Sequence, residues 1–150
     1  MSVPNGSRAL ELGATHTIDG RTPDLAKAVA ALGKGRGVDH SLDTTGVPEV
    51  VAASIGCLRQ RGSSAQVAAP PRGTRFPVEA SVLIGGGLTV RGVVEGDAVP
   101  GLFLPRLIAF FREERLPLDR IVSFYPFDEI NRAIEDMETG ATIKPVLRMN

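Results

Sequence analysis

The sequence has no tryptophan, one tyrosine and one cysteine among its 150 residues. With a single thiol, Cys57, the chain cannot form an internal disulfide, and such sparse cysteine is typical of a reducing compartment. No apolar run approaches the roughly 18 residues that a membrane-spanning helix needs. The first residues have neither the basic start nor the apolar centre of a signal peptide. These absences predict a cytoplasmic protein with no membrane partner.

An excess of charge is also missing, because 17 Lys and Arg residues balance 17 Asp and Glu residues. A surface that binds nucleic acid needs a basic excess to neutralise phosphates, so no nucleic-acid partner is expected. The binding of one small phosphorylated ligand is compatible with this balance. The length and the 43% hydrophobic content predict one globular domain.

The residues that usually carry catalysis form no recognisable constellation. His16 and His40 stand on predicted strands with no second metal ligand at a suitable spacing, so a structural role is expected for both. Cys57 lies near the end of a predicted helix, where the helix dipole raises the pKa of a thiol. The glycine-rich segment Gly33–Gly37 lacks the spacing of the known phosphate-binding loops and follows a helix rather than a strand. We therefore predict no catalytic residue and no metal ligand.

Short apolar runs alternate with segments of helical periodicity, which predicts an α/β fold with a mostly parallel sheet. The helix over residues 101–114 is apolar over so much of its surface that we expect it to be well buried. Residues 70–81 are expected to form a loop. The capping residues and the periodicity predict helices that end near Leu12 and that cover 24–32, 48–58, 101–114 and 128–139, with strands at 15–18, 38–42, 64–69, 88–94 and 121–124 and an extended segment at 143–149.

Small or hydroxyl residues follow three of the predicted strands, in the segments Asp43–Gly46, Val67–Ala69 and Val93–Glu95. In open α/β sheets the ligand crevice lies outside the carboxyl ends of the strands, and small residues there let a flat cofactor approach the backbone. Tight turns from strand to helix favour the same residue types, so the pattern alone leaves both interpretations open.

Five segments in one order carry a family resemblance. From about Arg8 onward the chain is similar to the C-terminal part of the cofactor domain of zinc-type medium-chain alcohol dehydrogenases, most of all the aryl-alcohol branch. The resemblance implies a partial Rossmann domain over residues 8–150 with an extended C-terminal tail. By this resemblance, the chain corresponds to neither the first βαβ strands of the Rossmann domain nor the GroES-like catalytic domain. Residues 1–7 resemble no part of the family and are expected to be unstructured. The segments are Leu12–His16, Val38–Gly46, Arg91–Asp97, Phe124–Asp128 and Ile143–Leu147.

The resemblance also implies contacts with NAD or NADP. Zinc is implied only for full-length relatives, because the zinc ligands, the proton relay and the substrate pocket belong to the family's other domain. The glycine loop and the acidic residue that reads the ribose would lie upstream of Arg8. Ala68 stands where many relatives have glycine. The implied contacts are Thr44, Thr45 and Gly46 on the adenosine side, Val67, Ala68 and Ala69 near nicotinamide, Val93 and Glu95 at the carboxamide, and Lys144 at the pyrophosphate.

Two functional hypotheses follow. The first is the cofactor-binding half of an NAD(P)-dependent alcohol dehydrogenase, inactive as an isolated chain. The alternative is a non-enzymatic remnant that acts as a self-associating α/β interaction domain. Without the first strands of the sheet, Thr15–Ile18 loses its only neighbour and Val38–Leu42 exposes one edge. The opposite edge, Leu88 to Val94, is where family dimers commonly join their sheets, so we expect a homo-oligomer or a rearranged fold.

Overall fold

The computed structural model describes residues 4–149 and is of the α/β class, with parallel sheets flanked by helices. The described chain divides into two compact units. One unit is Gly20–Ala98, and the other combines the described residues on either side of it. This division differs from the single domain expected from residue 8 onward. Within residues 4–149, no helix combines the length and the apolarity that crossing a bilayer requires.

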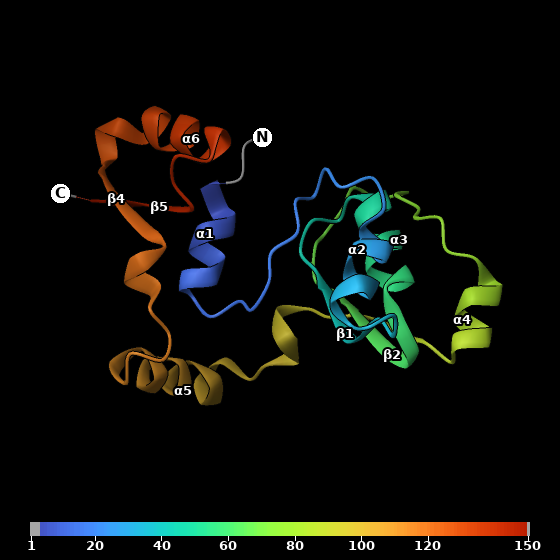
Figure 1. Cartoon of the computed structure of the whole chain (residues 1–150). Helices are drawn as coiled ribbons and strands as arrows, with labels where there is room; N and C mark the ends of the chain where they lie inside the picture. The colour runs from blue at the N-terminus through green and yellow to red at the C-terminus, as the bar shows by residue number, and fades with distance from the viewer. Residues whose placement is uncertain (1–3, 150) are drawn as a thin grey trace. The chain divides into compact units, whose positions relative to one another are not determined.

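The unit Gly20–Ala98 is built on a parallel sheet in the order β1-β2-β3, and Figure 1 labels the first two of these strands. All of its strand connections pass through helices, as parallel pairing demands. Its elements are α2 (Leu25–Leu32), β1 (Val38–Asp43), α3 (Pro48–Gly56), β2 (Leu58–Gln66), α4 (Ala80–Gly86), β3 (Thr89–Gly92) and the short 3-10 helix η1 (Glu95–Asp97).

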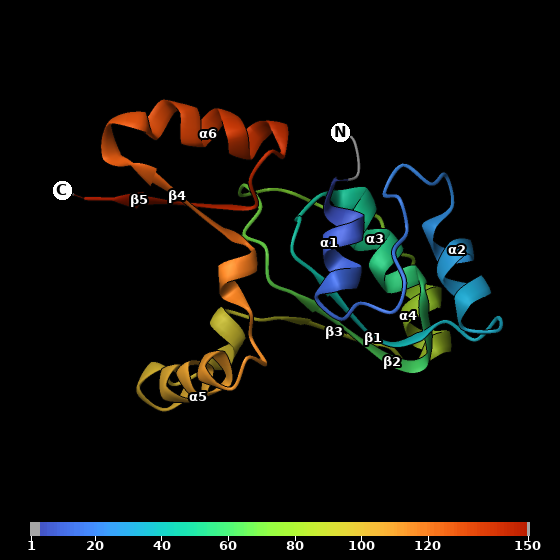
Figure 2. The same cartoon turned by 60° about the vertical axis from the view of Figure 1, so that its left-hand side comes forward.

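The core of this unit lies between α3 and the sheet. Pro48 occupies the first turn of α3, where its missing N–H costs nothing. Val51 and Ile55, on one face of α3, are 3% and 1% exposed. Helix α2 lies beside α3 in both views of the chain (Figures 1 and 2). As the sequence predicts, Asp24 caps α2, since its Oδ1 accepts a hydrogen bond of 2.9 Å from the backbone N–H of Lys27.

Several predicted elements need correction. Residues Thr15–Ile18, which lie outside this unit, do not form a strand, because no described strand pairs with their backbone. Strand β2 begins at Leu58 rather than near Ser64, because Leu58 already pairs with Val38. Residues 80–81, predicted as loop, open helix α4, which ends at Gly87 in the left-handed conformation with φ of 57°.

The second unit contains, among its described residues, a two-stranded parallel sheet, three α-helices and two short 3-10 helices. Helix α6 packs on β5 and buries Ala133 to 3% exposure. The Tyr125 hydroxyl donates a hydrogen bond of 2.9 Å to Asp136 Oδ2, which ties β4 to α6. The described elements are α1 (Pro4–Glu11), α5 (Pro100–Arg112), η2 (Leu118–Arg120), β4 (Val122–Pro126), η3 (Phe127–Glu129), α6 (Ile130–Thr139) and β5 (Lys144–Arg148).

The expected burial of the helix after residue 100 is wrong. No residue of α5 is buried, and Leu102 and Leu104 are 71% and 55% exposed. The composition of α5 is that of a core helix, but burial requires a second surface, and Leu102, Leu104 and Ile108 are each more than half exposed. Pro105 lies inside the helix, where proline cannot supply the N–H of a helical hydrogen bond.

Both ends of this unit also differ from expectation. Residues 4–7, expected to be unstructured, lie in α1, where Pro4 suits the first turn; Met1–Val3 lie outside the described residues. Asp128 lies within η3 and does not cap α6, whose N-cap position is Glu129.

Candidate functional site

The candidate site is the edge of the β1-β2-β3 sheet where the strands end. The register places Asp43 beside Gln66, and Gln66 beside Gly92, so the three carboxyl ends are level. Eight of the nine site residues named from the sequence lie in the segments that follow these ends. The structure therefore brings Thr44–Gly46, Val67–Ala69 and Val93–Glu95 to one edge of one sheet.

Asp43 organises the first of these segments. Its carboxylate is 2% exposed and accepts hydrogen bonds of 2.7 Å from Thr45 Oγ1 and 2.8 Å from the Gly46 N–H. Thr45 Oγ1 in turn accepts from the Val47 N–H at 3.1 Å. Burial acts to raise the pKa of Asp43, but the hydrogen bonds from Gly46 and Thr45 lower it more, so the pKa lies below its usual value. A buried anion thus fixes the turn after β1.

Gly46 is the point of closest approach between the first two segments. Its φ of +65° is in the left-handed region, where a residue with a side chain is strained. A Cβ atom at this position would lie 3.1 Å from the Ala68 Cβ and 3.4 Å from the Pro70 Cβ. Only glycine leaves the backbone of this turn uncovered, which is what a ligand resting on the strand ends requires.

The other two segments are held by backbone hydrogen bonds. The Val67 N–H donates to the Asp43 carbonyl at 3.0 Å, and the Val93 N–H donates to the Gln66 carbonyl at 3.0 Å. Both bonds extend the parallel ladder past the last residues of β2 and β3. Glu95 follows in a left-handed conformation, with φ of 49°, and is exposed.

Gln66 was not singled out from the sequence, yet it carries an unsatisfied acceptor at this edge. Its Nε2 donates to Ser64 Oγ at 2.8 Å, while its Oε1 is buried and has no hydrogen-bond partner among the described residues. The available sequence signal was a polar residue ending an otherwise small-residue strand. Asp43 was noted only as part of its segment, although a carboxylate just before Thr-Thr-Gly is itself a turn signal.

Lys144, the ninth residue, opens β5 in the other unit and is exposed. Its backbone N–H donates to the Ile121 carbonyl at 3.1 Å. A role for Lys144 toward a diphosphate stays a prediction.

The described residues do not fit a zinc ion, because no three His, Cys, Asp or Glu side chains gather as metal ligands within 4–149. His40 Nδ1 lies 2.7 Å from Ser63 Oγ on the neighbouring strand. Cys57 is 8% exposed, and burial raises the pKa of its thiol, so the thiolate needed for metal binding or catalysis is disfavoured.

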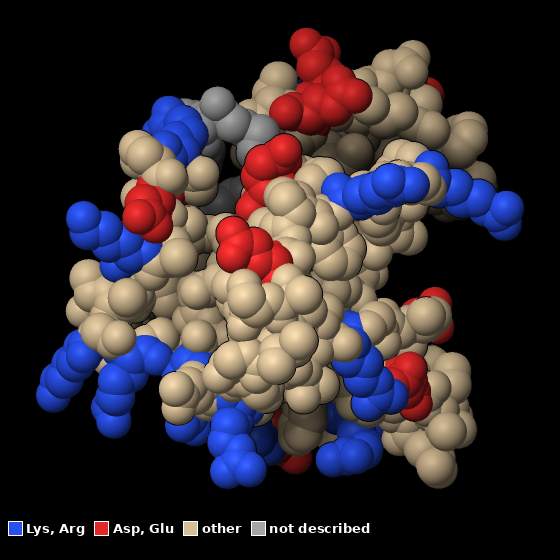
Figure 3. Space-filling view, turned by 90° about the vertical axis from the view of Figure 1, so that its right-hand side faces the viewer, with Lys and Arg blue, Asp and Glu red and all other residues tan. Residues whose placement is uncertain are grey.

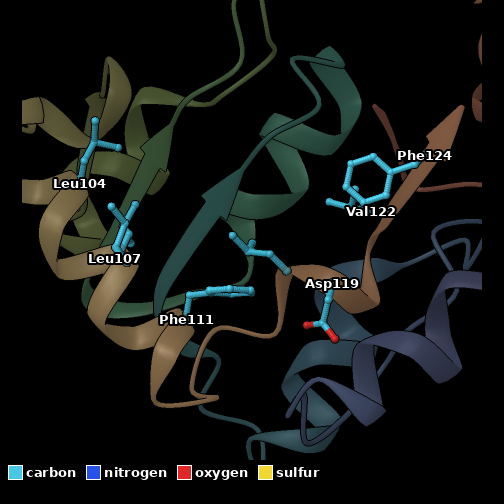
Figure 4. Close-up of a pocket in the computed structure, with 8 residues that line it drawn as sticks. Leu104, Leu107, Phe111, Asp119, Val122 and Phe124 are labelled. Atoms are coloured by element: carbon cyan, nitrogen blue, oxygen red, sulfur yellow. The ribbon is translucent and has the colours of Figure 1, made fainter. Parts of the chain in front are cut away.

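The unit that contains α5 has an apolar recess of about 510 Å³ (Figure 4). Asp119 is the one acidic residue among those that line it. The recess offers no set of polar groups that would orient a substrate for chemistry. The lining residues are Leu104, Leu107, Ile108, Phe111, Leu118, Asp119, Val122 and Phe124.

Comparison with known proteins identifies relatives of the chain. The model of the zinc-binding dehydrogenase family matches residues 5–111. A geraniol dehydrogenase from Castellaniella defragrans is 41% identical over 148 residues, which are 96% of this chain and 39% of that protein. The benzyl alcohol dehydrogenase structure from Acinetobacter calcoaceticus matches 97% of this chain and 40% of its own, at 37% identity and a TM-score of 0.92.

An alcohol dehydrogenase zinc-binding domain protein from Burkholderia ambifaria gives a TM-score of 0.91 at 43% identity, over 97% of this chain and 39% of that one. The chain thus spans about two fifths of the length of the relatives it matches. In these relatives the matching part is Rossmann-like, which agrees with the α/β class and the partial domain predicted from the sequence.

Proposed function

Because this chain belongs to the zinc-binding dehydrogenase family, we propose that it forms the later part of an NAD(P)-binding domain of an alcohol dehydrogenase. The observation that carries this proposal is the convergence of three strand ends, tied by Asp43 and opened by Gly46, at one edge of a parallel sheet. Ligands of open α/β sheets bind at that edge. The cofactor, when bound, supplies the nicotinamide ring that accepts or donates a hydride.

The residues at this edge fit parts of a dinucleotide. Thr44–Gly46 would face the adenosine side, Val67–Ala69 the nicotinamide, and the backbone at Val93 and Glu95 the carboxamide.

The substrate class is proposed from the relatives. Geraniol and benzyl alcohol, named in two of them, are primary alcohols whose carbinol carbon is attached to a double bond or an aromatic ring. We propose an alcohol of this allylic or benzylic kind as the substrate of the complete dehydrogenase.

The 150-residue chain alone is proposed to be inactive in alcohol oxidation, since the zinc ligands and proton relay implied by the resemblance belong to the family's other domain. The test is to incubate the purified chain with benzyl alcohol, NAD and zinc and to follow absorbance at the NADH band. Zinc-dependent formation of NADH would refute this part of the proposal.

Cofactor binding is tested by calorimetric titration of the chain with NAD and NADP. In Thr44→Glu a carboxylate stands at an exposed position on the adenosine side, where it repels the cofactor phosphates, and we expect affinity to fall about tenfold, equivalent to 1.4 kcal/mol. The matched control is Thr89→Glu, the same exchange at an exposed position near the start of β3. Equal loss in both variants, or no saturable binding by the unmodified chain, would contradict the proposal.

The alternative is a self-associating interaction domain, and two observations favour it. Strand β3 is an edge strand whose four residues are all exposed, and the apolar face of α5 is uncovered within the described chain. We propose a homo-oligomer joined through the edge at Leu88 to Val94. Light scattering should then show a dimer or larger species that Val90→Lys dissociates, because charge on an edge strand opposes pairing. A stable dimer without dinucleotide binding would favour this alternative over the cofactor role.

A further inference from the structure

The three-stranded sheet has a recess of its own at the end where β1 and β2 begin, opposite the strand ends described above. The segment Gly33–Gly37 leads from α2 into β1, and the segment Cys57–Gly62 follows α3 and includes the first residues of β2. The two segments meet at Cys57, whose carbonyl accepts a hydrogen bond of 3.0 Å from the N–H of Val38, the residue after Gly37. A Cβ atom on Gly37 would lie 2.5 Å from that same carbonyl oxygen, and φ at Gly37 is +75°. Glycine at this position is therefore needed for the contact.

The start of β2 is widened by a bulge that carries two arginines. Val38 pairs with Leu58, but His40 pairs with Ser63, so residues 59–62 stand opposite Asp39 alone. Such irregularities re-aim side chains at the ends of sheets. Arg61 has a φ of 62°, an uncommon conformation for a residue with a side chain. The bulge and the glycine-rich segment enclose a recess of about 320 Å³, lined by Gly33, Arg36, Gly37, Asp39 and Arg59.

Four cationic side chains, here called the basic cluster, belong to these two segments: Lys34, Arg36, Arg59 and Arg61. All four are exposed, and Figure 3 shows several Lys and Arg side chains along the lower part of the face it draws. Asp39 is the acidic residue of the recess; its Oδ1 accepts a hydrogen bond from Arg59 Nε and forms an ion pair with Arg59 Nη2. No ion pair holds the other three cations among residues 4–149.

The ion pair with Asp39 restrains Arg59 without using all of its donors. The guanidinium has five N–H donors, and those on Nη1 are left for another acceptor. Arg36 lines the same recess with its whole guanidinium free of ion pairs. Two guanidinium groups around one cavity form the arrangement that phosphate oxygens satisfy best, through paired N–H to oxygen bonds.

We infer that this recess binds a small phosphate-bearing anion. The cavity is at the lower end of the size range of small-molecule sites, which favours a compact anion over a polymer. The chain as a whole has no net charge, so it does not attract anions over its entire surface. The attraction for an anion is therefore confined to the basic cluster. Because β1 is six residues long, the recess lies about 16 Å from the strand ends where the dinucleotide is proposed to bind. The two sites are therefore separate.

The test uses inorganic pyrophosphate as the probe, titrated calorimetrically into the 150-residue chain in phosphate-free buffer of low ionic strength. We expect saturable binding at one site that weakens as salt is added. Arg36→Gln should lower the affinity about tenfold, equivalent to 1.4 kcal/mol, while Arg36→Lys keeps the charge but loses the planar fork and should fall in between. Arg75→Gln is the matched control, because Arg75 is exposed in the loop beyond the other end of β2.

Amide chemical shifts locate the probe. Pyrophosphate should shift the resonances of Gly33–Gly37 and Cys57–Gly62, and Thr44→Glu should leave its affinity unchanged. Equal losses in Arg36→Gln and Arg75→Gln, shifts confined to Thr44–Gly46, or no saturable binding would overturn the inference. Binding of an acidic polypeptide such as polyglutamate in place of pyrophosphate would also overturn it. Urea midpoints of each variant that match the unmodified chain establish that the fold is kept.

Discussion

The buried carboxylate of Asp43 gives the sharpest prediction about this chain, and Asp43→Asn is the perturbation that isolates it. The carboxylate accepts at both oxygens, 2.7 Å from Thr45 Oγ1 and 2.8 Å from the Gly46 nitrogen. An asparagine of the same shape accepts at one oxygen only and carries no charge; with that oxygen toward the Gly46 N–H, its NH₂ group can meet Thr45 Oγ1 only if that hydroxyl turns from donor to acceptor. Replacing hydrogen bonds to a charged, 2% exposed group in this way should cost about 1.5–3 kcal/mol of unfolding free energy.

The cost should depend on pH in a definite direction. The pKa of Asp43 is lower in the folded state than its unfolded value of about 3.9. The ionised group therefore stabilises the fold above that pH, and the stabilisation is lost as the pH falls through the folded pKa. Since asparagine resembles the protonated carboxyl, the difference between Asp43→Asn and the unmodified chain should be full at pH 7 and should shrink below about pH 4.

The assay is urea unfolding followed by far-ultraviolet circular dichroism, since the chain has no tryptophan. Asp24→Asn is the control. Asp24 also accepts a backbone hydrogen bond, from the Lys27 N–H, but asparagine caps helices about as well as aspartate, so this variant should lose little stability. If Asp43→Asn is as stable as the unmodified chain at pH 7, or if its deficit does not change with pH, the role assigned to Asp43 is wrong.

Two further predictions concern the core beneath α3. Ile55→Ala should lower the free energy of unfolding by about 2–5 kcal/mol because Ile55 is 1% exposed. Ile84→Ala, at an 81% exposed position, should lower it little. Urea midpoints measure both variants, and similar losses would contradict the packing described. The Cys57 thiol is buried and its pKa is raised, so Ellman's reagent at pH 8 should label it slowly in the folded chain and rapidly in urea; fast labelling of the folded chain would show that the thiol is accessible.

Local sequence signals anticipated the elements whose own residues supply what they need. Helix α2 has its cap in Asp24, α3 has its proline start at Pro48, and β1 has a short strand-forming run after a glycine-rich turn. The small residues after the strands could also be placed at one sheet edge, because parallel strands all end on the same side. Each of these inferences depends on residues close together along the chain.

The buried polar row beneath α3 could not be anticipated in this way. Ser64 is 1% exposed and accepts from Ser41 Oγ at 2.8 Å and from Gln66 Nε2 at 2.8 Å. From the sequence alone a serine is expected at the surface, and its burial can be predicted only when its hydrogen-bond partners on a neighbouring strand are known. From the sequence alone the arginines of the basic cluster are expected on solvated loops. The bulge at residues 59–62 results from the register between β1 and β2, which the sequence does not specify.

By itself, then, the sequence determined the α/β class, most helices and strands, and the family, since periodicity, caps and ordered motifs are properties of neighbouring residues. Tertiary structure decided which apolar surfaces are covered and which polar groups meet. Helix α5 has the composition of a core helix yet no buried residue, while Asp43 is charged yet 2% exposed. Burial and pairing depend on surfaces brought together from distant parts of the chain, and a linear pattern does not specify those contacts.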